Sequence, residues 1–156
     1  MQAKNLGAYF KNIKVTQIFT SNILRAQLTA KEIGNVIQKE PIVLDGVGER
    51  KVEYLNASEY TFIETSDDFY WRIIATKQTF ENLPEGRFIF VGHAIFLKSL
   101  LAYMILGDEV TEKVCDRMGD VLVVDNGTVS KCIYNHEKQK WRIGSLNEVV
   151  RLNFTN

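Results

Sequence analysis

The sequence predicts an α/β domain with three layers, in which a mostly parallel sheet is covered by helices on both faces. Segments with apolar residues at helical spacing alternate with short apolar runs that are rich in β-forming residues. Such apolar strands are typical of parallel sheets that are buried on both sides. Residues 1–156 are expected to form one domain, since a chain of this length buries about two thirds of its unfolded surface.

The first part of the chain predicts the order helix, strand, helix. Residues 2–11 carry apolar side chains at helical spacing, and residues 15–20 form a short β-rich run. Ser21 is expected to cap the next helix, over residues 22–38, because a serine oxygen can accept a free N–H group there. Residues 40–65 show no clear periodicity. They are interpreted as a long connection or a small insertion, the kind of segment that often carries specificity.

The second part of the chain continues the alternation. A helix over residues 68–82, capped by Ser66 or Asp67, leads to an apolar strand over residues 87–91. An apolar helix over Ala94–Leu106 follows that strand. Three further strands are predicted over residues 121–124, 128–134 and 141–146.

The composition argues against several classes of partner. Nineteen basic and nineteen acidic side chains cancel, which gives no electrostatic argument for nucleic acid or an anionic membrane. No apolar stretch reaches the roughly 18 residues of a membrane-spanning helix, and residues 1–12 lack the apolar core of a signal peptide. Cys115 and Cys132 form neither a metal-spaced pair nor a disulfide framework. We therefore expect a cytoplasmic protein with no metal or other cofactor.

Two predicted strands end in residues that suit an anion. Ser21 ends the first strand, and Arg25 lies four residues later, where it can reach back over a helix N-terminus. Gly92 and His93 end the later apolar strand, just before another helix. Ligands of parallel sheets bind outside the carboxyl ends of strands, so both stretches predict a phosphate or carboxylate site. Taken singly, a solvated surface arginine and a histidine bonded to a core carbonyl explain the same residues.

Together the two stretches resemble the histidine phosphatase superfamily, also called phosphoglycerate mutase-like. In that family a strand ends in Ser and the next helix carries Arg-Ala and Thr, as at Ser21, Arg25 and Thr29. A later strand ends in a small residue and His before an apolar helix, as at Gly92 and His93. The stretches QAKNLGAYFKN and VVDNGTVSKCIYNHEKQKWRIGSLNEVVRL resemble part of its first helix and its closing hairpin. The resemblance covers the chain except for about residues 37–65.

The resemblance implies a phosphoglycerate mutase-like fold and a phosphate pocket. Family members hydrolyse phosphomonoesters or transfer phosphoryl groups through a phosphohistidine. By this resemblance Ser21, Arg25, His93 and Ala94 would bind the substrate phosphate, and His93 would also be catalytic. The expected ligand is a phosphorylated small molecule or a phosphoprotein.

The nucleophile of the family is a histidine in an Arg-His-Gly stretch at the end of the first strand. The sequence holds no such stretch, and its only histidines are His93 and His136, the latter in an expected hairpin turn. The resemblance therefore implies a domain that is N-terminally truncated relative to the family and inactive as written. The alternative is a pseudoenzyme that binds a phosphate ligand or another protein.

The acid that protonates the leaving oxygen is, in the resembling families, a carboxylate in the middle region, commonly in a Leu-x-Glu stretch. The nearest match is VGE at residues 47–49, which makes Glu49 the predicted acid. Asp45 and Glu53 are its rivals. Charges on a surface loop explain all three residues equally well.

The strand that the resemblance lacks also affects the expected fold. In the family it lies beside the strand that ends at His93. Without it an apolar strand edge would remain unpaired, which destabilises a fold and favours aggregation. We therefore expect the strand Phe88–Val91 to be flanked on both sides, with a homodimer partner or a rearranged N-terminal segment in the vacant position.

Overall fold

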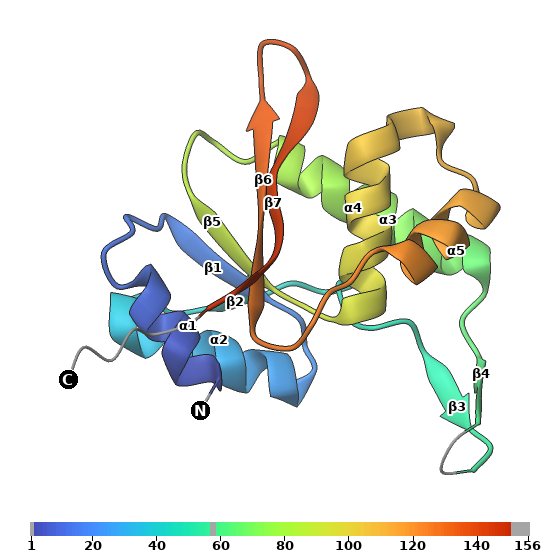
Figure 1. Cartoon of the computed structure of the whole chain (residues 1–156), viewed down its shortest axis with the longest axis horizontal. Helices are drawn as coiled ribbons and strands as arrows, with labels where there is room; N and C mark the ends of the chain where they lie inside the picture. The colour runs from blue at the N-terminus through green and yellow to red at the C-terminus, as the bar shows by residue number, and fades with distance from the viewer. Residues whose placement is uncertain (1, 57–58, 151–156) are drawn as a thin grey trace.

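Five α-helices and seven strands are described in residues 2–56 and 59–150 of the computed structural model (Figure 1). The first half contains α1 (Gln2–Phe10), β1 (Gln17–Thr20), α2 (Leu24–Ile37), β2 (Ile42–Val43), β3 (Val52–Tyr54) and β4 (Tyr60–Phe62). The second half contains α3 (Ser66–Glu81), β5 (Phe88–Val91), α4 (Ala94–Leu106), α5 (Glu112–Val121), β6 (Thr128–Asn135) and β7 (Lys140–Val149). A short 3-10 helix, Gly107–Glu109, connects α4 to α5.

The centre of the fold is a parallel sheet of three strands in the order β2-β1-β5. Different helices cover its two faces. Ile18 and Ile89 are register partners and belong to one core cluster with residues of α1 and α2. On the opposite face, the ring centroid of Phe80 in α3 lies 6.3 Å from that of Phe19 and 5.4 Å from that of Phe90. The predicted α/β fold, a parallel sheet with helices on both faces, is confirmed.

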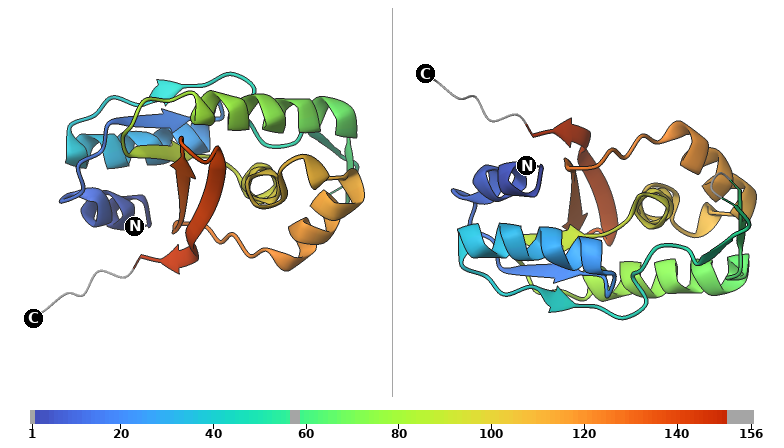
Figure 2. Two further views of the ribbon diagram at one scale, coloured as in Figure 1. Left: turned by 90° about the horizontal axis from the view of Figure 1, so that it is seen from above. Right: turned by 90° about the horizontal axis from the view of Figure 1, so that it is seen from below.

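Two antiparallel pairs of strands lie outside this sheet. The pair β3-β4 forms a ribbon that projects from the rest of the molecule (Figure 1). The hairpin β6-β7 lies between α1 and α4 (Figure 2). The Tyr9 hydroxyl of α1 donates to the Glu148 carboxylate of β7 at 3.1 Å, which attaches the hairpin to the N-terminal helix.

The start of α2 differs from the prediction. The helix begins at Leu24, and its N-cap is Ile23, whose side chain makes no capping bond. The expectation that Ser21 caps this helix is wrong because its Oγ accepts the Ile23 N–H at 3.2 Å within the connecting turn. Ser21 therefore shapes the turn between β1 and α2 rather than the first turn of α2.

The start of α3 differs in a similar way. Its cap is Thr65, whose Oγ1 accepts the Asp68 N–H at 3.1 Å, rather than Ser66 or Asp67. The helix therefore starts at Ser66, two residues before the predicted start at residue 68.

The predicted strand over residues 121–124 is also wrong. Residues up to Val121 form α5, which Thr111 caps by accepting the Val114 N–H at 3.3 Å. Cys115 is buried on the inner side of this helix, in the same core cluster as residues of α3 and α4. The short apolar run that suggested a strand thus begins at the last residue of α5, and residues 122–124 form neither a helix nor a strand.

The described residues supply β5 with a neighbouring strand on one side only, so the second neighbour that the sequence predicts does not come from them. It pairs with β1 from Phe88 opposite Gln17 to Val91 opposite Thr20, and it pairs with no other strand in the described part of the chain. The described N-terminal segment forms α1 and does not rearrange into a neighbouring strand. One edge of β5 therefore has no partner strand among residues 2–56 and 59–150.

None of the helices in the described ranges combines the length and the apolarity needed to cross a membrane.

Candidate functional site

The parallel pairing of β1 and β5 brings together two side chains that lie 72 positions apart in sequence. Thr20 and Val91 are register partners and the last residues of their strands. The chain therefore leaves both strands at the same, carboxyl-terminal end of the sheet. Ser21 Oγ and His93 Nε2 are 2.7 Å apart there. Both residues are buried, with exposed fractions of 0% for Ser21 and 5% for His93. The expected location of a ligand site in such a sheet thus contains two buried polar groups in contact.

Ser21 has a second bond that fixes its hydroxyl. The Ile23 N–H donates to Ser21 Oγ, as described above, and the hydroxyl then has a proton and a further lone pair left for the imidazole. It can donate to a bare Nε2 of His93 or accept from a protonated one. The turn after β1 therefore orients the histidine in either protonation state.

Gly92 is required by packing rather than by its backbone angle. A Cβ atom at this position would lie 2.9 Å from the Phe90 ring, closer than real Cβ contacts allow. The ring of Phe90 in turn packs against Phe80 and Phe96 on the helix-covered face of the sheet. A larger residue before His93 would displace this ring and, with it, the start of α4.

The electrostatic surroundings keep His93 neutral. Burial, with a smaller contribution from the positive charge of Arg25, lowers the pKa of His93 to about 4. Arg25 itself is exposed on the first turn of α2. The guanidinium of Arg25 therefore lies close enough to His93 for its charge to lower the histidine pKa. An anion that bound between the two groups could contact both.

The carboxylate of Glu49, a residue of the loop between β2 and β3, contacts the first turn of α4, the helix that follows His93. This carboxylate accepts the Ile95 N–H at 3.3 Å and the Phe96 N–H at 3.0 Å. His93 is the N-cap of this helix but makes no side-chain capping bond, so Glu49 supplies the cap from a distant loop. Ala94, the first residue of α4, is exposed next to this carboxylate.

The two rival carboxylates lie in different surroundings. Asp45 and Glu53 are both exposed, the first before Gly46 in the loop and the second on β3 of the projecting ribbon. Of the three predicted candidates, Glu49 has the contacts to α4 described above. The structure thus places Ser21, Arg25, His93, Ala94 and Glu49 near the carboxyl ends of β1 and β5.

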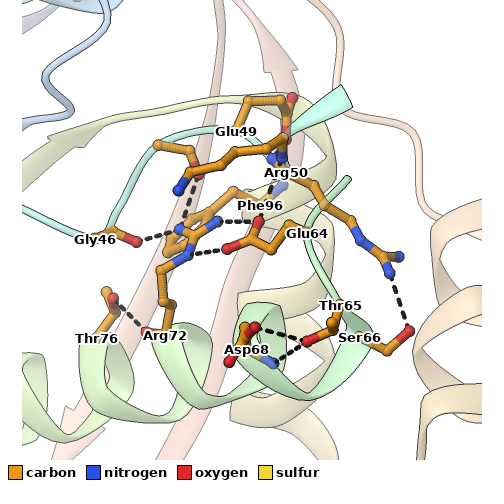
Figure 3. A network of polar contacts seen from close by, with 12 residues as sticks. Gly46, Glu49, Arg50, Glu64, Thr65, Ser66, Asp68, Arg72, Thr76 and Phe96 are labelled. Carbon is orange, nitrogen blue, oxygen red and sulfur yellow. Dashed lines mark hydrogen bonds and ion pairs between the residues drawn. The ribbon is translucent and has the colours of Figure 1, made fainter. Parts of the chain in front are cut away.

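Sequence reasoning missed the residues that hold the Glu49 loop in place. Arg72 of α3 donates to the carbonyl oxygens of Gly46 and Gly48 and forms an ion pair with Glu64 (Figure 3). These partners lie 8 to 26 positions from Arg72 in sequence, with no shared periodicity. No local signal could have identified them.

The remaining histidine and the recorded cavities lie elsewhere. His136 is exposed in the turn between β6 and β7, with its ring 4.9 Å from that of Tyr134. It lines a cavity of about 650 Å³ between this turn and the end of α3, and a second cavity, of about 140 Å³, borders the loop at Gly46. Within residues 2–56 and 59–150, no group of three His, Cys, Asp or Glu side chains could hold a metal ion.

Comparison with known proteins agrees with the resemblance in the sequence. Residues 1–61 match the model of the histidine phosphatase superfamily (branch 1). No curated protein matches the sequence. The resemblance to this superfamily, inferred from the strand-end residues, is confirmed.

Solved structures of similar fold cover nearly the whole chain. A candidate alpha-ribazole-5'-P phosphatase from Escherichia coli has a TM-score of 0.76 at 18% identity, over 97% of this chain and 83% of that chain. A mycobacterial glucosyl-3-phosphoglycerate phosphatase has a TM-score of 0.67 at 15% identity, over 95% of this chain and 85% of that chain. A phosphoglycerate mutase from Plasmodium falciparum has a TM-score of 0.60 at 18% identity, over 99% of this chain and 83% of that chain. At these identities the likeness establishes the fold, which is phosphoglycerate mutase-like.

Proposed function

We propose that this chain, with its histidine phosphatase-type match and phosphoglycerate mutase-like fold, binds the phosphoryl group of a phosphate ester beside His93. The observation that carries the proposal is the 2.7 Å contact between two buried side chains, Ser21 and His93, at adjacent strand ends. A buried polar pair at this edge, with an arginine charge close to it, suits an anion better than an apolar ligand.

Each residue of the proposed site has a role that follows from its chemistry. Arg25 binds two phosphoryl oxygens through its guanidinium, and the N–H of Ala94 offers a further donor at the start of α4. His93 donates to a third oxygen while Ser21 holds its ring. Because the anion compensates the charge of Arg25, binding also favours the protonated form of His93.

Glu49 is the proposed acid of the site. Its carboxylate faces the first turn of α4, one residue from Ala94, where the leaving oxygen of a bound ester would lie. The helix N–H groups hold this carboxylate in place. Protonated, it could supply the proton that a departing alcohol needs.

We further propose that these 156 residues bind the ester without turning it over. Phosphohistidine chemistry needs an attacking imidazole in addition to the groups that hold the phosphoryl oxygens. The described contacts commit the ring of His93 to Ser21, and His136 is exposed in a remote hairpin turn. Loss of a covalent nucleophile commonly lowers the rate by many powers of ten.

The ligand class that we propose is a phosphorylated small molecule. The names of the similar solved structures refer to esters of sugar or glycerate phosphates and to alpha-ribazole phosphate, which are phosphorylated small molecules. We propose this class, with a phosphoprotein as the other possible ligand. The alternative is a pseudoenzyme, a module that binds a phosphate ligand or another protein without phosphoryl transfer.

An assay with an aryl phosphate tests the proposal, together with a phosphate titration followed by amide chemical shifts. We expect shifts at Ala94 and His93 on titration and no release of the aryl alcohol above background. Turnover of roughly 1 per second or more would show that another residue has taken the nucleophile's role. Absence of any shift at these amides would remove the anion site.

A further inference from the structure

The loop that carries Glu49 is held by one arginine of α3. Arg72 Nη1 donates to the Gly48 carbonyl oxygen at 3.2 Å and to that of Gly46 (Figure 3). Gly46 has a positive φ of +79°, so the chain turns sharply at the first of these two carbonyls. Both contacts come directly before Glu49, and they fix the direction in which the loop approaches α4.

A carboxylate fixes the arginine in turn. Glu64 accepts from Arg72 Nε and Nη2, each at 2.7 Å, in a two-pronged ion pair. Burial raises the pKa of Glu64, but the bonds and charge of Arg72, with contributions from Lys51, lower it overall below its usual value. Only 6% of the Glu64 side chain is exposed, so the pair is shielded from solvent and salt.

The arginine also contacts the helix that receives the Glu49 carboxylate. The guanidinium carbon of Arg72 lies 5.6 Å from the ring centroid of Phe96 and 5.3 Å from that of Phe69. The backbone N–H of the same Phe96 donates to Glu49. Arg72 thus touches both the loop and the first turn of α4, and the carboxylate bridges these two elements.

We propose that Arg72, oriented by Glu64, is a positioning residue that fixes the Glu49 carboxylate on the first turn of α4. The role of Glu49 as an acid rests on the proposed function, whereas its placement by Arg72 does not. Arginine suits this position because one planar group makes four bonds in three directions. A lysine would offer three donors from a single atom and could not span the carbonyls and the carboxylate together.

Hydrogen exchange at the Ile95 and Phe96 amides tests the placement. Both amides donate to the Glu49 carboxylate. The variant Glu49→Ala therefore gives the reference exchange rate of these amides when the carboxylate cap is absent. We expect Arg72→Lys to raise both rates about ten-fold or more, and Glu64→Gln to raise them in the same direction. The Leu101 amide, deep in α4, serves as the internal reference for global stability.

The control is Lys77→Gln on the same helix. It breaks an ion pair with Glu81 that is also 2.7 Å long but does not touch the loop, and it should leave both rates unchanged. If Arg72→Lys does not fold, Glu64→Gln decides alone, because it keeps the size of the side chain but replaces one of the two oxygens that accept from Arg72 with an NH2 donor. Rates within two-fold of the wild type at both amides, in whichever of these variants folds, would overturn the proposal. Phosphate binding by the wild type is measured in a separate titration. If phosphate does not bind, the proposed function fails, but the exchange rates still test whether Arg72 positions Glu49.

Discussion

At the scale of single residues, the site depends on a histidine that is kept neutral. Burial and Arg25 lower the pKa of His93 to about 4, whereas a histidine in an unfolded chain titrates near 6.5. Between these values the unfolded chain binds a proton that the folded chain does not, so the free energy of unfolding falls as the pH falls. The groups of other elements that act on His93 are Ser21, which contacts its Nε2, and Arg25, whose positive charge lowers its pKa.

We therefore predict that His93→Gln flattens the dependence of stability on pH. The wild type should lose about 3 kcal/mol more than the variant between roughly pH 6.5 and pH 4. Urea unfolding at several pH values measures this difference. His136→Gln is the matched control, because His136 is exposed in a turn and its removal should leave the pH dependence as in the wild type. Parallel curves for His93→Gln and the wild type would contradict the account.

At the scale of elements, the cap of α3 provides a direct test of how that helix begins. Thr65→Ala removes the oxygen that accepts the Asp68 N–H and should lower the free energy of unfolding by about 1 kcal/mol. Thr79→Ala is the control, since its hydroxyl bonds the Ala75 carbonyl inside the same helix and caps nothing. Urea unfolding compares the two variants. Equal effects would mean that Thr65 contributes nothing as a cap.

The elements also show how much the sequence could predict. The apolar residues were sufficient to predict α1, α4, β5 and the final hairpin, because the signals are local: a helical stripe in α1, continuous apolar runs in α4 and β5, and short β-rich runs in the hairpin. The caps were misassigned because Ser21, Ser66 and Asp67 all have suitable side chains, and only the folded turn decides which oxygen meets an N–H group. The sequence could have predicted α5, whose apolar residues recur at helical spacing; the apolar run that suggested a strand begins only at its last residue, Val121.

The sequence likewise identifies some residues of the candidate site and not others. Ser21, Arg25 and His93 could be identified because each follows a recognisable strand within a few residues. Glu49 was one of three carboxylates until the fold placed it on α4. Arg72 and Glu64 could not be identified, since their partners lie in a loop that has no periodicity of its own.

At the scale of the whole molecule, one edge of β5 has no partner strand in the described part of the chain, which exposes unpaired backbone groups. Residues 2–10 form α1 rather than a neighbouring strand, and a second copy of the chain is the partner that we propose for this edge. We predict a concentration-dependent dimer in size-exclusion chromatography with light scattering. A monomer at every concentration tested would show that this edge is tolerated without a second copy.

The central claim is that Arg25 and His93 bind one anion together. Vanadate titration of the wild type, Arg25→Ala, His93→Ala and the double variant tests it most directly, with Lys31→Ala as the control for a lost positive charge on the exposed side of α2. Each single substitution should weaken binding by about ten-fold or more, because each removes a charge-assisted bond. The double variant should lose less than the sum of the two effects, because the anion is their shared partner. Unchanged affinity in both single variants, or a loss in Lys31→Ala equal to that in Arg25→Ala, would contradict the site and leave only the fold.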